Sequence, residues 1–306
     1  MVTATEKRSA CGSLDLSLRG NGFGLALVLV VLSTTIQISK ALSFPGEKID
    51  TWRGYQRHVF QIDSCEAWVV EPKKPAPGKP WSWCMEFPDA FTERTGVPQL
   101  LENGFNHLHI VVGNTFGCPA ALKHFDAFYA AITGQGLAKK GTLIGISRGG
   151  LYAYNWAARN PDKVVCIYGD APVCDFKSWP GGKGRGRGSP GDWQALMKDY
   201  GFASELEALA YRQNPVDELA PLAKAGIPII HVVGDADDVV PVAENTQIVE
   251  TRYLALGGTI VVIHKPGIGH HPHGLDDPAP TVKFILESTA KSLRSGLRQA
   301  SGALSR

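Results

Sequence analysis

The sequence carries almost no excess charge of either sign. Its 31 Lys and Arg residues against 29 Asp and Glu residues leave a formal net charge of only +2, so the basic footprint of a nucleic-acid-binding protein is missing. Internal repeats and a collagen-like glycine period are missing as well. Apolar residues make up 44% and charged residues 20% of the chain, which excludes a disordered protein and is enough to bury a large core. We therefore expect one large globular domain and no nucleic-acid partner.

Cysteine is also scarce, with six residues in the whole chain. Cys11 falls in the N-terminal segment described next, and the others are odd in number and show no C-x-x-C spacing. A dense disulfide framework is therefore excluded. Cys84 and Cys166 lie in apolar runs and are expected to be small buried hydrophobic residues. One disulfide that involves Cys118 or Cys174 stays open.

The N-terminal segment has the pattern of an export signal. An apolar run at 23–32 and the small residues of Ser39-Lys40-Ala41 follow three cations, Lys7, Arg8 and Arg19. This order is typical of a signal peptide, and we expect residues 1–41 to be removed and the protein to be exported to the periplasm or the medium. An uncleaved membrane anchor is the alternative. The run is much shorter than the roughly 20 residues that span a bilayer, so we expect no stable membrane insertion.

From residue 55 onward, short apolar runs alternate with longer stretches that have helical spacing. This alternation predicts a mostly parallel sheet flanked by helices, in a single domain over residues 42–300. The run that ends near Tyr168 is followed by about 55 residues without another strand pattern, so we expect a lid insertion over residues 171–226. The predicted strands are 55–62, 67–70, 81–87, 105–112, 142–146, 164–168, 227–233 and 259–263, and the predicted helices 120–133, 151–159, 243–256 and 281–293.

The segment Gly145-Ile146-Ser147-Arg148-Gly149-Gly150 stands between a predicted strand and a predicted helix. A serine hydroxyl must project from a tight turn to be reached by a base, and flanking glycines let the strand and the helix approach closely. The strand–turn–helix context therefore predicts a nucleophile elbow with Ser147 at its tip. The alternative is a glycine-rich turn whose serine only caps the helix.

Carboxylates and histidines follow two later strands. Asp235, Asp237 and Asp238 come after the strand predicted at 227–233, and His270 and His271 come after the strand predicted at 259–263. The carboxyl ends of parallel strands meet at one edge of a sheet, where open α/β folds bind ligands. We therefore expect these side chains to lie near Ser147.

The segments around Ser147, Asp237 and His270 follow one another in this order along the chain, and with them residues 55–293 resemble the α/β-hydrolase superfamily. Within it, the chain is most similar to exported bacterial proteins of the esterase and prolyl-oligopeptidase-like branch. The resemblance implies that Ser147 is the nucleophile. It implies that His270, after a Gly-x-Gly turn, is the general acid and base, and that Asp237 orients the imidazole. No cofactor is implied.

Some assignments stay open. Asp235 and Asp238 are neighbours of Asp237 and can serve as turn caps, while some relatives carry their acid at the position of Asp170. His271 competes with His270 for the role of the base. A metal site could be formed by a histidine cluster, namely His264, His270, His271 and His273. No H-E-x-x-H motif and no carboxylate at ligand spacing accompany it, so we expect no metal.

The resemblance also implies two backbone N–H donors for a developing oxyanion. One is the amide of Arg148. The His-Gly-Gly run of the lipases is absent from the loop after the strand at 81–87, where Cys84-Met85-Glu86-Phe87-Pro88 stands instead. The second donor is therefore expected to be the amide of Phe87 or of Glu86.

The predicted function is a serine carboxylic ester hydrolase that works through an acyl-enzyme. The glycine- and cation-rich loop at 181–188 is either a solvated loop or an attractor of anionic substrates. Tryptophans near the expected site suggest a small-molecule or acylated oligosaccharide substrate, although core packing is the alternative for each of them: Trp81, Trp83, Trp179 and Trp193. The alternatives in function are a prolyl-oligopeptidase-type peptidase and a catalytically silent binding module.

Overall fold

The computed structural model describes residues 41–304, and their side chains up to residue 295. From Leu42 onward the chain forms one compact unit. The predicted export signal lies, except for Ala41, outside the described residues, and it stays a prediction. None of the helices within residues 41–304 combines the length and the apolar character that crossing a bilayer requires.

A nine-stranded sheet runs through the described residues, in the order β1-β2-β3-β5-β4-β6-β7-β8-β9. β1, β2, β3 and β5 pair antiparallel with one another in this order. β5, β4, β6, β7, β8 and β9 then pair parallel in this order. All strands predicted from the sequence are present, and β1 was missed because four of its five residues are exposed. The strands are β1 Lys48–Trp52, β2 Tyr55–Ile62, β3 Cys65–Val70, β4 Trp81–Cys84, β5 Asn106–Ile110, β6 Gly141–Ile146, β7 Val164–Asp170, β8 Ile229–Gly234 and β9 Ile260–Lys265.

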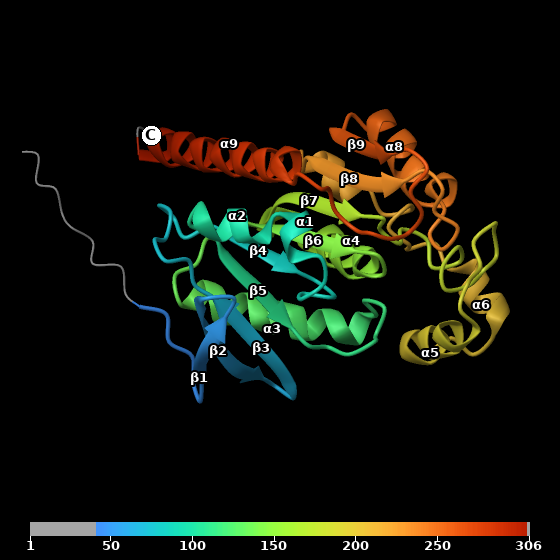
Figure 1. Cartoon of the computed structure of the whole chain (residues 1–306), viewed down its shortest axis with the longest axis horizontal. Coiled ribbons are helices and arrows are strands. Elements are labelled where there is room, and N and C mark those ends of the chain that lie inside the picture. The colour runs from blue at the N-terminus through green and yellow to red at the C-terminus, as the bar shows by residue number, and fades with distance from the viewer. Residues whose placement is uncertain (1–40, 305–306) are drawn as a thin grey trace, which may run out of the picture. The chain divides into compact units, whose positions relative to one another are not determined.

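Helices cover both faces of this sheet (Figure 1). Successive side chains of a strand point to opposite faces. In β6, Leu143 therefore joins the core under α3 (Pro119–Gly134), α4 (Gly149–Arg159) and α8 (Thr246–Ala255). Its neighbour Ile144 joins the core under α2 (Val97–Glu102) and α9 (Ala279–Leu304). The short α1 (Thr92–Thr95) precedes α2. The predicted α/β layering is confirmed.

Two predictions about aromatic and thiol residues are decided by burial. Trp81 and Trp83 are 0% exposed, and Trp193 is 5% exposed. The Trp83 ring packs against Phe125, with ring centroids 5.2 Å apart, and against three further aromatic rings, so its truncation would cost about 3–5 kcal/mol. These three tryptophans are core residues and cannot stack on a sugar.

The open disulfide prediction is wrong, because each cysteine in residues 41–304 is buried and free.

The segment between β7 and β8 carries three helices, α5 (Pro190–Tyr200), α6 (Glu205–Ala210) and α7 (Ala220–Lys224). Phe176 and Tyr211 stack at the centre of a small aromatic core in this segment. Asn245, at the start of α8, holds the beginning of the segment by accepting from the amides of Cys174 and Asp175 at 2.8 and 3.1 Å. The segment coincides with the predicted insertion, and its action as a lid stays a prediction.

Candidate active site

Ser147 stands at the turn between β6 and α4, and its backbone has φ +51°. A non-glycine residue in this left-handed region costs about 1–3 kcal/mol, which the surroundings must offset. The Ser147 amide donates to the carbonyl oxygen of Asp170 at 2.9 Å, and the Ser147 carbonyl accepts from Val173 at 2.8 Å. A Cβ on Gly145 would lie 2.9 Å from the Gly149 carbonyl oxygen, so glycine is required there. The turn is therefore the strained elbow that the sequence predicts.

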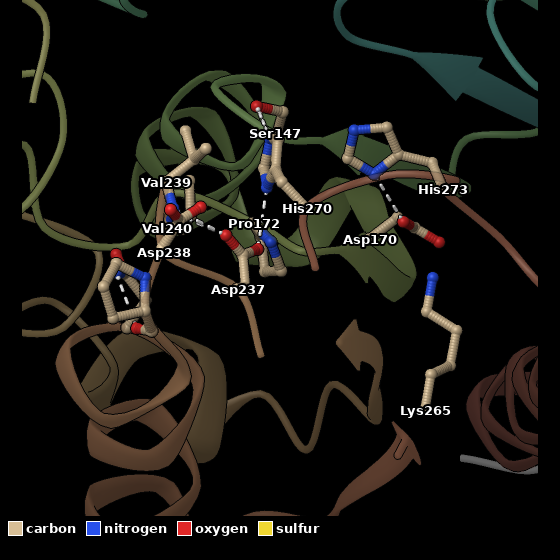
Figure 2. A network of polar contacts seen from close by, with 12 residues as sticks. Ser147, Asp170, Pro172, Asp237, Asp238, Val239, Val240, Lys265, His270 and His273 are labelled. Carbon is tan, nitrogen blue, oxygen red and sulfur yellow. Dashed lines mark hydrogen bonds and ion pairs between the residues drawn. The ribbon is translucent and has the colours of Figure 1, made fainter. Parts of the chain in front are cut away.

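Ser147, His270 and Asp237 form a continuous chain of hydrogen bonds (Figure 2). The Ser147 Oγ lies 2.9 Å from Nε2 of His270, and Nδ1 of His270 lies 2.7 Å from Oδ2 of Asp237. The other Asp237 oxygen accepts from the amides of Val239 and Val240 at 2.9 and 2.8 Å. A carboxylate only accepts, so Nδ1 carries the proton and Nε2 is left to accept the serine proton.

The loops that carry the acid and the histidine are joined to each other. The Ala236 amide donates to the Ile268 carbonyl at 2.9 Å. A Cβ on Gly234 would lie 2.2 Å from the Gly269 carbonyl oxygen, so only glycine allows this approach. Because β8 and β9 are neighbouring parallel strands, their carboxyl-end loops meet and bring Asp237 to His270.

The structure also separates the competing candidates. Asp235 lies 2.6 Å from Nδ1 of His264, at the surface. Asp238 pairs with Arg187 at 2.9 Å, and both side chains are exposed. His271 is exposed and stacks on Phe91, with ring centroids 5.9 Å apart. None of these three predicted alternatives joins the hydrogen-bond chain at Ser147.

Asp170 belongs to a second carboxylate–histidine pair beside the first (Figure 2). It is 0% exposed, and its carboxylate accepts from Nδ1 of His273 at 2.8 Å, the Gly274 amide at 2.8 Å and the Tyr168 hydroxyl at 2.6 Å. Burial raises the pKa of Tyr168 far above its usual value, and the neighbouring Asp170 adds to this effect, so the hydroxyl stays a donor. Asp170 therefore holds the histidine loop and not the His270 ring.

Two cations complete the anchoring of this loop. Arg94, from α1, donates through Nε to the His273 carbonyl at 2.7 Å. Lys265, from the end of β9, donates through Nζ to the Pro272 and Gly274 carbonyls at 2.6 and 3.2 Å. The sequence analysis missed the roles of His273 and Arg94. The repeated histidines after Gly269 were the only signal for the former.

The candidate oxyanion donors lie on two loops that an ion pair joins. Arg148 directly precedes α4 as its N-cap, and its guanidinium donates to the Glu86 carboxylate from two nitrogens at 2.8 and 3.1 Å. It also lies 4.9 Å from the centre of the Phe87 ring. Within residues 41–304 no acceptor pairs with the backbone N–H of Arg148, Glu86 or Phe87. Burial raises the pKa of Glu86, and the Arg148 charge works against this rise.

One nitrogen from each of His270, His271 and His273 lies within 4.8 Å of the others. Both ring nitrogens of His270 are already hydrogen-bonded, to Ser147 and to Asp237. Metal ligation by His270 would therefore break the contact with Ser147 or with Asp237. The donor set does not suit a metal together with the hydrogen-bond chain.

The cation-rich loop at 181–188 is held against its neighbours. Lys183 pairs with Glu205 of α6, and Arg187 pairs with Asp238. The Arg187 amide also donates to the Asp238 carbonyl at 3.1 Å. With two of its cations paired, this loop has little charge left to attract an anionic substrate.

The sheet order, the strained elbow after β6 and the loops after β8 and β9 define the α/β-hydrolase fold, and comparison with solved structures agrees. A puromycin-hydrolyzing peptidase of Mycobacterium tuberculosis matches with a TM-score of 0.59 and 14% identity, over 76% of this chain and 38% of its own. A lipase-like protein (lip1) of Acinetobacter baumannii matches with a TM-score of 0.53 and 13% identity, over 80% of this chain and 93% of its own.

A third similar structure is Est1E from Butyrivibrio proteoclasticus, with a TM-score of 0.51 and 16% identity, over 80% of this chain and 99% of its own. The chain thus spans well under half of the peptidase and nearly all of the other two proteins. No protein-family model matches the sequence, and no curated protein is significantly similar to it.

Proposed function

We propose that the protein is a serine hydrolase that cleaves carboxylic esters through an acyl-enzyme. The observation that carries this proposal is the hydrogen-bond chain from Ser147 through His270 to Asp237. Ser147 is the nucleophile, His270 the general base and then the general acid, and Asp237 the residue that orients the imidazole and stabilises its cation.

The reaction proceeds in two balanced halves. Ser147 Oγ attacks the acyl carbon while its proton moves to Nε2 of His270, and the carbonyl electrons form an oxyanion. The oxyanion accepts from the amide of Arg148 and from that of Phe87 or Glu86, and loss of one such donor typically costs ~3 kcal/mol. The oxyanion then collapses, the alcohol leaves with the proton from His270, and water repeats the sequence to release the acid.

The clamp between Glu86 and Arg148 supports the assignment of the second donor to the loop after β4. The Glu86 nitrogen lies 3.6 Å from the point where a Cβ on Gly149 would stand, which puts the loop after β4 against the first turn of α4. The ion pair between the two side chains keeps this loop and the elbow together. A fixed pair of donors is what oxyanion stabilisation needs.

A peptidase is the second candidate function, because the same side chains cleave amides when the histidine protonates the leaving nitrogen. The puromycin-hydrolyzing peptidase has a similar fold. Nearly full-length correspondence with the lipase-like protein and Est1E favours the ester. Of the four tryptophans that suggest an acylated oligosaccharide, three are buried, so Trp179 is the one left to support that substrate.

Short-chain p-nitrophenyl esters and a fluorophosphonate probe test the proposal. Wild type should hydrolyse the ester and take the label, and Ser147→Ala should do neither. Ser295→Ala changes an exposed serine on α9 and should behave as wild type. A wild-type protein that takes no label would support the silent binding module, and turnover of prolyl anilides without any ester would support the peptidase.

We also propose export, with residues 1–41 as a removed signal. N-terminal sequencing of the protein recovered from the periplasm or the medium tests this. A mature chain that begins at or near Leu42 agrees with it, and a chain that retains Met1 in the cell contradicts it.

A further inference from the structure

A cavity of about 290 Å³ lies beside the candidate oxyanion donors. It is formed by the loops that follow β4 and β5. Glu86, Phe87 and Arg148 line it on the side of the site, and His109 and Val111 line it from the end of β5. The cavity therefore shares three residues with the site but holds none of the three side chains of the hydrogen-bond chain.

The order of strands places this cavity on one side of the nucleophile. β4 and β5 lie on one side of β6, and β7, β8 and β9 lie on the other. Ser147 follows β6, while Asp237 and His270 follow β8 and β9. His270 must protonate the leaving group, which therefore lies on the histidine side of Ser147. The acyl group then extends the other way, toward the cavity.

The walls and the size of the cavity suit a short apolar chain. Phe87 and Val111 are unusually exposed for large apolar residues, at 36% and 46%, and both line this cavity. Covering them with an acyl chain would remove apolar surface from water. The volume lies at the lower end of the roughly 300–1,000 Å³ typical of small-molecule sites, and an acyl group of a few carbons fits there.

Polar side chains among the lining residues are those of Glu86, Arg148, Asn114 and His109, and His109 has one ring nitrogen without a hydrogen-bond partner in residues 41–304. Nδ1 of His109 donates to the Cys84 carbonyl at 2.7 Å, which fixes the tautomer and leaves Nε2 as an acceptor. Burial lowers the pKa of His109, so the ring is neutral at neutral pH. Within residues 41–304 Nε2 has no hydrogen-bond partner, and unlike Nε2 of His107 it is not shut off from solvent.

We infer that this cavity binds the acyl part of the substrate and that His109 selects short acyl chains that carry a hydroxyl group. The inference rests on the proposed ester hydrolysis. The hydroxyl donates to Nε2 of His109, while the chain covers Phe87 and Val111. A charged ammonium group is a poorer fit, because the one carboxylate that lines the cavity, Glu86, is already paired with the Arg148 guanidinium.

The test compares kcat/KM for p-nitrophenyl esters of butanoate, 3-hydroxybutanoate and 3-aminobutanoate. Wild type should prefer 3-hydroxybutanoate over butanoate by about 5–10-fold, the value of one neutral hydrogen bond. His109→Phe keeps a ring of similar size and should reduce this ratio to about one. The matched control His124→Phe alters a histidine on α3 that pairs with Asp63 instead, and the preference should stay.

Val111→Trp is a second variant, in case His109→Phe does not fold. The larger side chain fills the mouth of the cavity from an exposed position. The kcat/KM values for the butanoate and 3-hydroxybutanoate esters should therefore fall relative to that for p-nitrophenyl acetate. Equal turnover of the hydroxylated and plain esters by wild type would overturn the inference, and so would a preference for the amino ester. In either case Ser147-dependent ester hydrolysis would leave the proposed function standing, whereas its absence would remove both.

Discussion

Replacing Asp170 by asparagine tests whether the second carboxylate–histidine pair positions the first. The side chain of Asp170 accepts from His273, Gly274 and Tyr168, and its carbonyl accepts from the Ser147 amide. One residue thus joins the nucleophile elbow to the loop that carries His270. The substitution keeps the size of the side chain and removes its charge.

The expected loss of stability can be estimated from these contacts. In its best orientation the asparagine oxygen keeps the Tyr168 and Gly274 donors, and its amide group faces Nδ1 of His273, which must give up its proton. Hydrogen bonds to charged groups contribute about 1.5–3 kcal/mol and neutral ones about 0.5–1.5 kcal/mol. We therefore expect the free energy of unfolding to fall by about 1–2 kcal/mol.

The loss of activity should be larger than a stability change of this size implies, but smaller than that caused by removing one of the three proposed catalytic residues. A displacement of about 1 Å at a reacting group can cost up to ~100-fold in rate, so kcat for Asp170→Asn should fall about 10–100-fold with little change in KM. Asp237→Asn, which removes the acceptor for Nδ1 of His270, should lower kcat by about 10⁴-fold.

Urea unfolding and p-nitrophenyl butanoate kinetics measure the two effects, with Tyr168→Phe as the control. That variant removes one donor to the Asp170 carboxylate and leaves the histidine loop bonded, so it should lose about 1.5–3 kcal/mol of stability and keep kcat within about threefold. If Asp170→Asn were as inactive as Asp237→Asn, Asp170 would orient the base itself. If it matched wild type in both measurements, the network would have no positioning role.

Three other predictions follow from contacts outside the proposed catalytic residues Ser147, His270 and Asp237. Glu86→Gln weakens the ion pair with Arg148 and should lower kcat about 10-fold. This is less than the loss of a whole oxyanion donor, which costs ~3 kcal/mol of barrier. An unchanged kcat would show that the ion pair has no part in catalysis. The carboxylates of Glu71 and Glu47, at 2.6 and 2.7 Å, raise the pKa of buried His58. The stability it contributes is therefore full below pH ~6.5 and is lost as pH rises through the higher folded value. Denaturant unfolding across that range should show this loss in wild type and not in His58→Gln. A thiol reagent should label no cysteine of the folded chain and five after unfolding, because each described cysteine is buried and free; a sixth would show that the predicted signal is retained.

Local patterns were enough to predict the strands, the main helices and the elbow. Ser147 could be singled out because glycines on both sides, a buried strand before and a helix after it are all encoded within a few residues. The strand β1 could not be predicted, since its residues are mostly exposed and gain their partner only by pairing with β2. The strand predicted at 81–87 ends at Cys84, and it cannot reach Phe87, which has a left-handed backbone that no strand allows.

The sequence by itself therefore determined that a serine, several carboxylates and several histidines would meet at one edge of a parallel sheet. Only the tertiary structure decided that His270 faces Asp237 while His273 faces Asp170. Each choice depends on the backbone angles of a loop and on hydrogen bonds from distant elements, such as those of Arg94 and Lys265. Spacing along the chain carries no such information, because neighbouring residues of a loop lie close together while their side chains point in different directions.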